Sequence, residues 1–262
     1  MNVLEAIAAK KARLEFLRPL SPEALAKLEH YFDIEITYSS NAIEGNTLSP
    51  VETTLVIEQG IAIGGKPLKD HLEALDHYDA IRYVRELGRQ SVPLTESDIR
   101  SLDSLVVQRS NPALAGRYAD SSRYVRTEIG RHVFPFPAEI PSLMGDFAAW
   151  LRDAPETPVT AFMAHRRLVD IHPFNDGNGR TARLLMNLVL IRAGYPPVAV
   201  RPEDRLTYIR ALQQAQAGLG TEPFDTILYE RLDATLGEYL SALTEADPIS
   251  EAAHDVEGPG SP

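Results

Sequence analysis

Apolar residues recur at helical spacing along most of the chain. Between residues 21 and 45 they lie three or four positions apart, on one face of a helix: Leu25, Leu28, Phe32 and Ile36. Ser21 can cap the start of this helix, Pro22 suits its first turn, and Gly45 can end it. The pattern predicts a helix of about six turns.

Helix start signals and helical periodicity also occur elsewhere. The stretch "SPVE" at 49–52 is a capping box that opens a helix ending at Gly60, and "TESD" at 95–98 opens a helix that runs to about Arg109. Six further segments have the same character: 67–88, 138–153, 157–171, 179–194, 202–218 and 223–243. We expect antiparallel helices joined by short connections.

The helical pattern is interrupted from Asn111 to Pro137. This segment contains glycines, prolines and a short β-prone stretch from Tyr124 to Val133, so we expect a long loop with a β-hairpin. The predicted fold class is therefore all-α, a helical bundle with one small hairpin.

Composition narrows the class of protein. The chain has 26 Lys and Arg against 37 Asp and Glu, a formal charge of −11, which argues against nucleic-acid binding because phosphate neutralisation needs a basic face. Residues 246–262 hold acids and prolines without Lys or Arg, and we expect them to be a disordered acidic tail. Cysteine is absent, no apolar run approaches the roughly 20 residues of a membrane span, and the first residues lack a signal-peptide pattern. We expect a cytoplasmic protein.

The stretch "HPFNDGNGRTAR" at 172–183 lies between two apolar helices, so its polar residues occupy a turn and the first turn of the second helix. Glycines on both sides of Asn178 allow backbone N–H groups to converge at a helix N-terminus, where unpaired donors and the helix dipole favour an anion. Arg180 and Arg183 lie three residues apart and can bind further phosphate oxygens from one face of that helix. The stretch predicts a phosphate-binding site.

Two more side chains in this stretch suit phosphoryl or nucleotidyl transfer. Asp176 is a hard carboxylate that can hold Mg²⁺ between two phosphates. His172 has an ordinary pKa that suits a base near neutral pH. His165 lies seven residues earlier without a third metal ligand at a suitable spacing, so we interpret it as structural.

These residues fill every specified position of the motif H-x-F-x-[DE]-G-N-G-R-x-x-R, so the chain resembles the Fic/Doc family of protein adenylyltransferases. The resemblance implies a Fic-fold catalytic core over 93–240, an N-terminal helical lobe over 1–92, and transfer of AMP from ATP to a hydroxyl side chain of a target protein. It implies His172 as the base, Mg²⁺ or Mn²⁺ on Asp176, and Arg183 at the γ-phosphate. It also places four residues around the α- and β-phosphates: Gly177, Asn178, Gly179 and Arg180.

The stretch "SNAIEG" at 40–45 fits the family's inhibitory pattern [ST]-x-x-x-E-[GN]. Glu44 is expected in the last turn of a helix, where a carboxylate faces the negative end of the dipole and needs a cation. The resemblance nominates Arg183 as that cation, with Ser40 supporting Glu44 by a hydrogen bond and Gly45 completing the pattern. Since a paired Glu44 occupies the arginine that the γ-phosphate needs, we expect it to autoinhibit the enzyme.

The predicted hairpin also has a role in the resemblance, because family members lay a β-hairpin flap over the site to align the target backbone beside the nucleotide. The flap is expected at "TEIG", which comprises Thr127, Glu128, Ile129 and Gly130. Tyr208 and Gln216 fall where the family places residues that line the adenosine.

Other activities of the same site stay open at this point. Some relatives that carry the inhibitory glutamate remove AMP from a target, and others transfer a phosphate, a uridylyl group or phosphocholine. A non-enzymatic alternative is an inactive nucleotide-sensing interaction module. The predicted partners are ATP and an unknown protein target, with no nucleic acid and no membrane, and a homodimer is possible.

Overall fold

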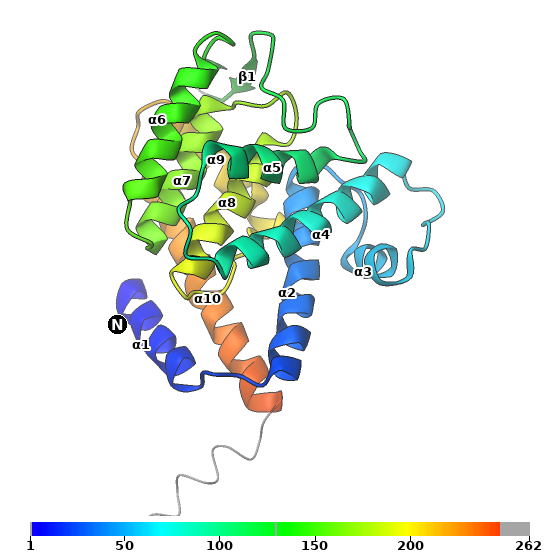
Figure 1. Cartoon of the computed structure of the whole chain (residues 1–262), viewed down its shortest axis with the longest axis vertical. Coiled ribbons are helices and arrows are strands. Elements are labelled where there is room, and N and C mark those ends of the chain that lie inside the picture. Colours follow the sequence, from blue (N-terminus) through cyan, green and yellow to red (C-terminus); the bar gives the residue numbers. More distant parts are fainter. Residues whose placement is uncertain (1, 129, 247–262) are drawn as a thin grey trace, which may run out of the picture.

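The computed structural model describes residues 2–128 and 130–246, which form a bundle of α-helices with one β-hairpin (Figure 1). The helices are α1 (Val3–Phe16), α2 (Pro22–Ile43), α3 (Pro50–Gln59), α4 (Leu68–Gly88), α5 (Glu96–Val107), α6 (Ile140–Asp153), α7 (Pro158–Ile171), α8 (Asn178–Arg192), α9 (Arg205–Gln216) and α10 (Glu222–Ala246). The short 3₁₀-helix η1 (Pro202–Asp204) precedes α9, and the strands are β1 (Tyr124–Thr127) and β2 (Gly130–Val133). The predicted all-α class is confirmed.

Several helices begin where local side chains satisfy the backbone. Ser49 with Glu52, and Thr95 with Asp98, form the two predicted capping boxes at the starts of α3 and α5. Helix α3 is followed by Gly60, whose φ of 64° is a left-handed conformation that glycine adopts without a Cβ clash. Local sequence therefore determines these boundaries.

Helix α1 has no counterpart among the helices expected from the sequence. It begins with a capping box in which Glu5 N–H donates to Asn2 Oδ1 at 2.9 Å and Asn2 N–H donates to Glu5 Oε2 at 3.0 Å. Its buried side chains are Ile7 and Leu14, so its apolar period is weak. Contact with α10 supplies the burial that the local pattern does not indicate.

Helix α8 lies at the centre of the bundle. Apart from Gly179, every residue from Asn178 to Leu190 is buried, and α8 contacts α7, α4, α5 and α2. Figure 1 shows these helices around it. A helix that is buried on all sides needs partners on all sides. Its N-terminus, which carries the motif, is therefore held by much of the core.

Helix α2 is fastened to α4 by buried polar contacts. Nε of Arg85 donates to both carboxylate oxygens of Asp33, at 2.8 and 3.0 Å, and the hydroxyl of Thr37 lies 3.1 Å from Nδ1 of His77. Burial lowers the pKa of His77 well below its ordinary value, so this imidazole is neutral near pH 7. These contacts fix the second half of α2, which leads to Glu44.

The predicted hairpin is confirmed over its predicted range. Strands β1 and β2 pair antiparallel, with Tyr124 opposite Val133 and Thr127 opposite Gly130. Ile129, between them, lies outside the described residues, and so does the predicted tail from residue 247 onward. Across the two described ranges, the helices are too short or too polar to traverse a lipid bilayer.

Candidate active site

His172 follows α7 directly and has an unusual backbone conformation. Its φ of 50° and ψ of 55° are left-handed, and within the described residues no other non-glycine residue has a positive φ. Its N–H still donates to the carbonyl of Leu168 at 2.8 Å, so it closes the last turn of the helix. A non-glycine residue with this backbone conformation is strained, and the conformation persists where surrounding contacts stabilise it.

The turn after His172 is held by hydrogen bonds to its backbone. The side-chain amide of Asn178 accepts from Phe174 N–H at 2.9 Å through Oδ1 and donates to the Phe174 carbonyl at 2.7 Å through Nδ2. Ala119 N–H donates to the Pro173 carbonyl at 2.8 Å. The side chain of Asn178 therefore shapes the turn, and the group that this residue can offer an anion is its backbone N–H.

The N-terminus of α8 presents backbone donors. Gly177 precedes the helix with a φ of 80°, and a Cβ there would lie 3.0 Å from Oδ1 of Asp103, so both conformation and space require glycine. The first backbone bond of the helix runs from Thr181 N–H to the Gly177 carbonyl, at 2.8 Å. The three N–H groups of residues 178–180 therefore have no acceptor within the helix, and together with the dipole they favour an anion.

Asp176 lies at the mouth of this anion site. Its Oδ1 accepts from Gly177 N–H at 2.7 Å and from Arg180 at 3.3 Å, whereas its Oδ2, among the described residues, has only a long contact to Asn111, at 3.5 Å. Within the described ranges, no group of three or more potential side-chain ligands could hold a metal by itself. A single carboxylate with one weakly used oxygen fits Mg²⁺, which takes most of its ligands from phosphates and water.

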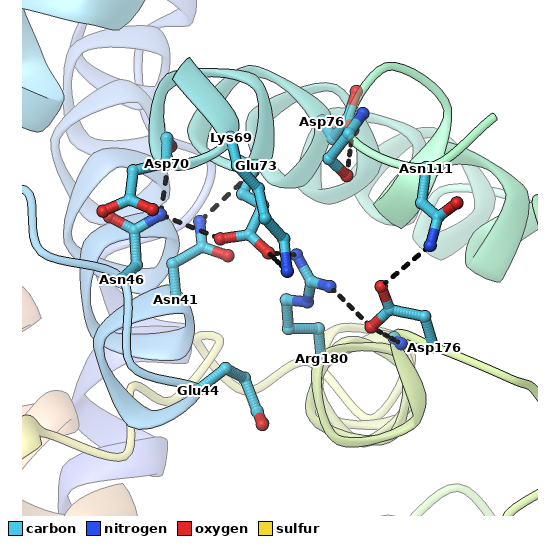
Figure 2. A network of polar contacts seen from close by, with 12 residues as sticks. Asn41, Glu44, Asn46, Lys69, Asp70, Glu73, Asp76, Asn111, Asp176 and Arg180 are labelled. Carbon is cyan, nitrogen blue, oxygen red and sulfur yellow. Dashed lines mark hydrogen bonds and ion pairs between the residues drawn. The ribbon is translucent and has the colours of Figure 1, made fainter. Parts of the chain in front are cut away.

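Arg180 lies between two carboxylates, as Figure 2 shows. Its Nη2 is 3.3 Å from Oδ1 of Asp176, and its Nη1 is 3.3 Å from Oε1 of Glu73 on α4. Its side chain is almost fully buried. A phosphate that binds Arg180 therefore has to compete with these carboxylates.

Arg183, one turn further along α8, is bound by the end of α2. Its Nε donates to the hydroxyl of Ser40 at 2.9 Å, and its Nη2 donates to the Ser40 carbonyl at 3.0 Å and to Oε1 of Glu44 at 2.7 Å. The expected hydrogen bond from Ser40 to Glu44 stays a prediction, and the contacts that the structure gives Ser40 are with Arg183. Ser40 faces the guanidinium, because it lies one turn earlier on the same face of α2.

The carboxylate of Glu44 lies over the first turn of α8. A Cβ built on Gly179 would collide with Glu44 Oε1, so the absence of a side chain at Gly179 is what lets the carboxylate approach. Partial desolvation opposes its ionisation, although 40% of its side chain is exposed, and Arg183, with help from Arg180 and Arg205, lowers the pKa of Glu44. Glu44 is thus an anion bound where the helix dipole and an arginine favour one.

The turn after Glu44 is tied to α4. Nδ2 of Asn46 donates to the carbonyl of Asp70 at 3.0 Å and to Oε2 of Glu73 at 3.1 Å. Thr47 donates to Asp70 through its N–H and its hydroxyl, at 2.8 and 2.6 Å. Figure 2 shows Glu73 between Asn46 and Arg180, so one buried carboxylate contacts both the turn after Glu44 and the motif at 172–183.

The imidazole of His172 is enclosed by residues at the base of the hairpin. The ring of Phe134 is stacked on it, with centroids 3.9 Å apart and planes 14° apart. Burial lowers the pKa of His172 to about 4, and the charge of Arg123 adds to the shift. The imidazole is therefore neutral near pH 7 and can accept a proton.

The residues expected to line adenosine lie near the site in different environments. Tyr208 is buried, and its hydroxyl is 2.7 Å from Nε2 of His165. Burial lowers the pKa of His165 to about 3, which agrees with its interpretation as structural. Gln216 ends α9, half-buried and close to Asp170. The Tyr208 ring has almost no exposed face on which an adenine ring could stack.

The expected flap residues lie at the tip of the hairpin. Glu128 accepts from Arg210 of α9 at 2.7 to 3.1 Å, and the hydroxyl of Thr127 donates to the Gly130 carbonyl at 2.9 Å. Both partners of the Glu128–Arg210 pair are exposed, so the pair adds little stability. The tip of the hairpin therefore contacts α9 through an exposed ion pair that holds it only weakly.

Four residues of the site were not identified from the sequence: Arg123, Phe134, Glu73 and Asp103. Each acts through tertiary contact, from a segment distant from the motif. The "SSR" before β1 and the "FPF" after β2 carry no local signal for contact with His172. A carboxylate within a predicted apolar helix face, as at Asp103, is a signal that could have been used.

Asp103 of α5 gives a testable consequence for stability. It is fully buried and accepts from Gly116 N–H at 3.0 Å and from the Thr181 hydroxyl at 3.3 Å. Burial raises its pKa to about 8, and the charge of Asp176 adds to the shift. The folded protein therefore keeps this proton at pH values where the unfolded chain has lost it, so this contribution to stability falls as the pH rises from 4 to 8.

Asp103→Asn removes this dependence, because asparagine does not titrate. We expect the difference in Tm between the variant and the parent to be roughly 7–14 °C more favourable to the variant at pH 8 than at pH 5. Thermal unfolding at the two pH values measures this difference. An equal Tm difference at both pH values would show that the carboxyl is not protonated in the folded protein.

The fold and the site together define a class of protein. Its all-α core presents a helix N-terminus that favours an anion, a histidine precedes this terminus, and a carboxylate contacts it. Comparisons identify the family. The Fic/DOC family model matches residues 93–190. A Fic domain-containing signalling protein from Bacteroides thetaiotaomicron has a TM-score of 0.83 and 31% sequence identity, over 92% of this chain and 96% of that one. Fic-1 from C. elegans (residues 134–508) has a TM-score of 0.80 and 30% identity, over 93% and 72% of the two chains.

The chain therefore belongs to the Fic/DOC family. Curated relatives include "Protein adenylyltransferase Fic" of Nematostella vectensis, 39% identical over 85% of this chain and 52% of the relative. The protein of the same name from Aedes aegypti is 37% identical over 91% of this chain and 48% of the relative. The chain thus spans about half the length of these curated relatives.

Proposed function

We propose that this protein transfers AMP from ATP to a hydroxyl side chain of a target protein and is restrained by its own Glu44. The observation that carries the proposal is the carboxylate of Glu44 on the N-terminus of α8, paired with Arg183 and next to the turn that carries His172. A site that binds a carboxylate in this way has donors for phosphate oxygens. The names of the curated relatives support the adenylyl group as the one transferred.

In this proposal the residues of the motif have separate tasks. The N–H groups at the start of α8 and Arg180 bind the α- and β-phosphates, and Arg183 binds the γ-phosphate. Asp176 would hold Mg²⁺, which neutralises phosphate charge when bound. His172 accepts the proton of the target hydroxyl, whose oxygen forms a bond to the α-phosphorus while the bond to the β-phosphate breaks and pyrophosphate leaves.

Glu44 restrains this reaction by occupying Arg183. If the paired state outweighs the open one about 100-fold, roughly 2.7 kcal/mol separates them, which one partly buried pair can supply. While the pair persists, the γ-phosphate lacks its arginine and the triphosphate cannot settle along α8. Ligands that engage the carboxylate or the turn at residues 45–48 would release it.

The proposal is tested by the fate of labelled phosphates. We expect the Glu44→Gly variant, given a heat-treated lysate whose own kinases are inactive as a source of targets, to incorporate label from α-³²P-ATP into protein and none from γ-³²P-ATP. Mass spectrometry of the labelled proteins should find an added AMP. Incorporation of the γ-label would identify phosphate transfer instead, and incorporation of neither would remove the transferase proposal.

Removal of AMP from a target is the second candidate. The charge of Glu44 acts on His172 in this structure, raising its affinity for a proton, so a carboxylate lies within electrostatic reach of the base. Such a carboxylate can orient water for attack on a modified side chain. Release of AMP from an AMP-modified protein by the unsubstituted enzyme, and its loss in Glu44→Gly, would identify this direction.

A further inference from the structure

The base of the hairpin holds His172 at two points. Phe134, the residue after β2, lies flat against the imidazole at 3.9 Å and is itself only 4% exposed. Arg123, the residue before β1, donates to the backbone carbonyl of His172, and also to that of Phe174 at 2.7 Å. One residue thus contacts the ring and the other contacts the backbone.

These two residues are joined to each other. Phe134 N–H donates to the Arg123 carbonyl at 3.1 Å, which continues the hairpin pairing by one step beyond the strands. Arg123 and Phe134 therefore move with β1 and β2. Any displacement of the hairpin is transmitted to both contacts with His172.

His172 needs such support because its local sequence does not favour its conformation. A non-glycine residue with a φ of 50° is strained, and the following Pro173 disfavours helical conformations at this position. The helix end by itself thus leaves the imidazole poorly determined. The stacked ring limits both its rotation and its access to water.

We infer that Phe134 is a positioning residue that fixes the imidazole of His172 and couples it to the hairpin. This inference rests on the proposed function of His172 as the base. Docking of a target along the hairpin then sets the orientation of the base as well as that of the target. Correct orientation of a reacting group is worth about 100-fold in rate for a displacement near 1 Å.

The test uses the Glu44→Gly enzyme as the background. We expect Phe134→Leu to lower kcat for AMP transfer about tenfold while the KM for ATP stays within twofold, because the phosphate contacts are unchanged. Phe134→Tyr keeps the ring and should retain kcat within about twofold. Phe136→Leu is the matched control, since Phe136 is 59% exposed on the same segment, and it should have no effect.

A second readout does not depend on catalysis. The charged and titratable groups that face His172 are Arg123 and His132 from the hairpin segment and Glu44 from the end of α2. Arg123 and Glu44 have no ring contact with Phe134, whereas His132 also packs edge-on against it, at 5.0 Å between ring centroids. His132→Gln, with and without Phe134→Leu, therefore separates loss of the stacked ring from a change at His132. The pKa of His172, measured by NMR titration, should rise by about one unit in Phe134→Leu and should be unchanged in Phe136→Leu.

The outcomes separate this inference from the proposed function. An unchanged His172 titration in Phe134→Leu would overturn the inference whether or not the protein transfers AMP, and so would an unchanged kcat. Equal loss of kcat in Phe134→Tyr and Phe134→Leu would also overturn it, because stacking would then not be the cause. Failure of the proposed function would appear separately, as no α-label transfer by the Glu44→Gly background itself.

Discussion

Glu44→Gly is expected to raise the incorporation of AMP into protein about 100-fold. The substitution removes the carboxylate that is bound to Arg183 at 2.7 Å and that lies against Gly179. Both the arginine and the helix terminus then become available to the triphosphate. The factor is the assumed 100-fold excess of the paired state over the open one, which corresponds to roughly 2.7 kcal/mol.

Labelled-ATP incorporation at equal protein concentrations measures this effect. Glu44→Gln is the matched variant, since it keeps the size of the side chain and loses its charge, and it should give an intermediate increase. Glu58 of α3 forms an exposed pair with His30 of α2, and Glu58→Gln should give no increase in incorporation. If Glu44→Gly is no more active than the parent, Glu44 has no regulatory role.

His172→Ala in the Glu44→Gly background is expected to abolish transfer. General bases contribute about 10²–10⁴ in rate, and removal of the whole imidazole also removes the group that orients the target hydroxyl. ATP binding should remain within a few-fold of the background, because the contacts expected for the phosphates come from α8. Rates and ATP affinity, measured together, separate chemistry from binding.

The pH dependence gives an independent check on His172. Burial holds its pKa at about 4, below the ordinary value of 6.5, so the base is neutral above about pH 5. We expect the rate of the Glu44→Gly enzyme to lose little between pH 7 and pH 5.5 and to fall as the pH approaches 4. His30→Gln should leave this profile unchanged, since His30 lies on the outer side of α2 beside Glu58. A rate that falls with a midpoint near 6.5 would assign the base to another group or to an imidazole exposed to water.

Local signals in the sequence predicted most of the fold and part of the site. The capping residues Ser49 and Thr95 fixed the starts of α3 and α5, and glycines with a β-prone stretch located the hairpin. The helix-end position of Glu44 indicated only that its carboxylate needs a cation, and the family resemblance supplied Arg183 as that cation. These features depend on neighbours within one turn or on a spaced motif.

The remaining features depend on tertiary packing. Phe134 and Arg123 contact His172 because the hairpin folds back on the end of α7, and their sequence positions carry no period or motif that indicates this. Glu73 appears as one charge among several on an amphipathic helix, yet it contacts both Arg180 and Asn46. The contact of Ser40 with Arg183 could not be read from the sequence either, because it joins residues 143 positions apart.

The most direct measurement is a crystal structure of the Glu44→Gly enzyme with Mg²⁺ and a non-transferable ATP analogue. The account predicts phosphate oxygens on the N–H groups at the start of α8, the metal at Asp176, and the terminal phosphate on Arg183 in the space that the Glu44 carboxylate fills in the parent. An analogue bound elsewhere, or a triphosphate that leaves Arg183 without a phosphate, would contradict it.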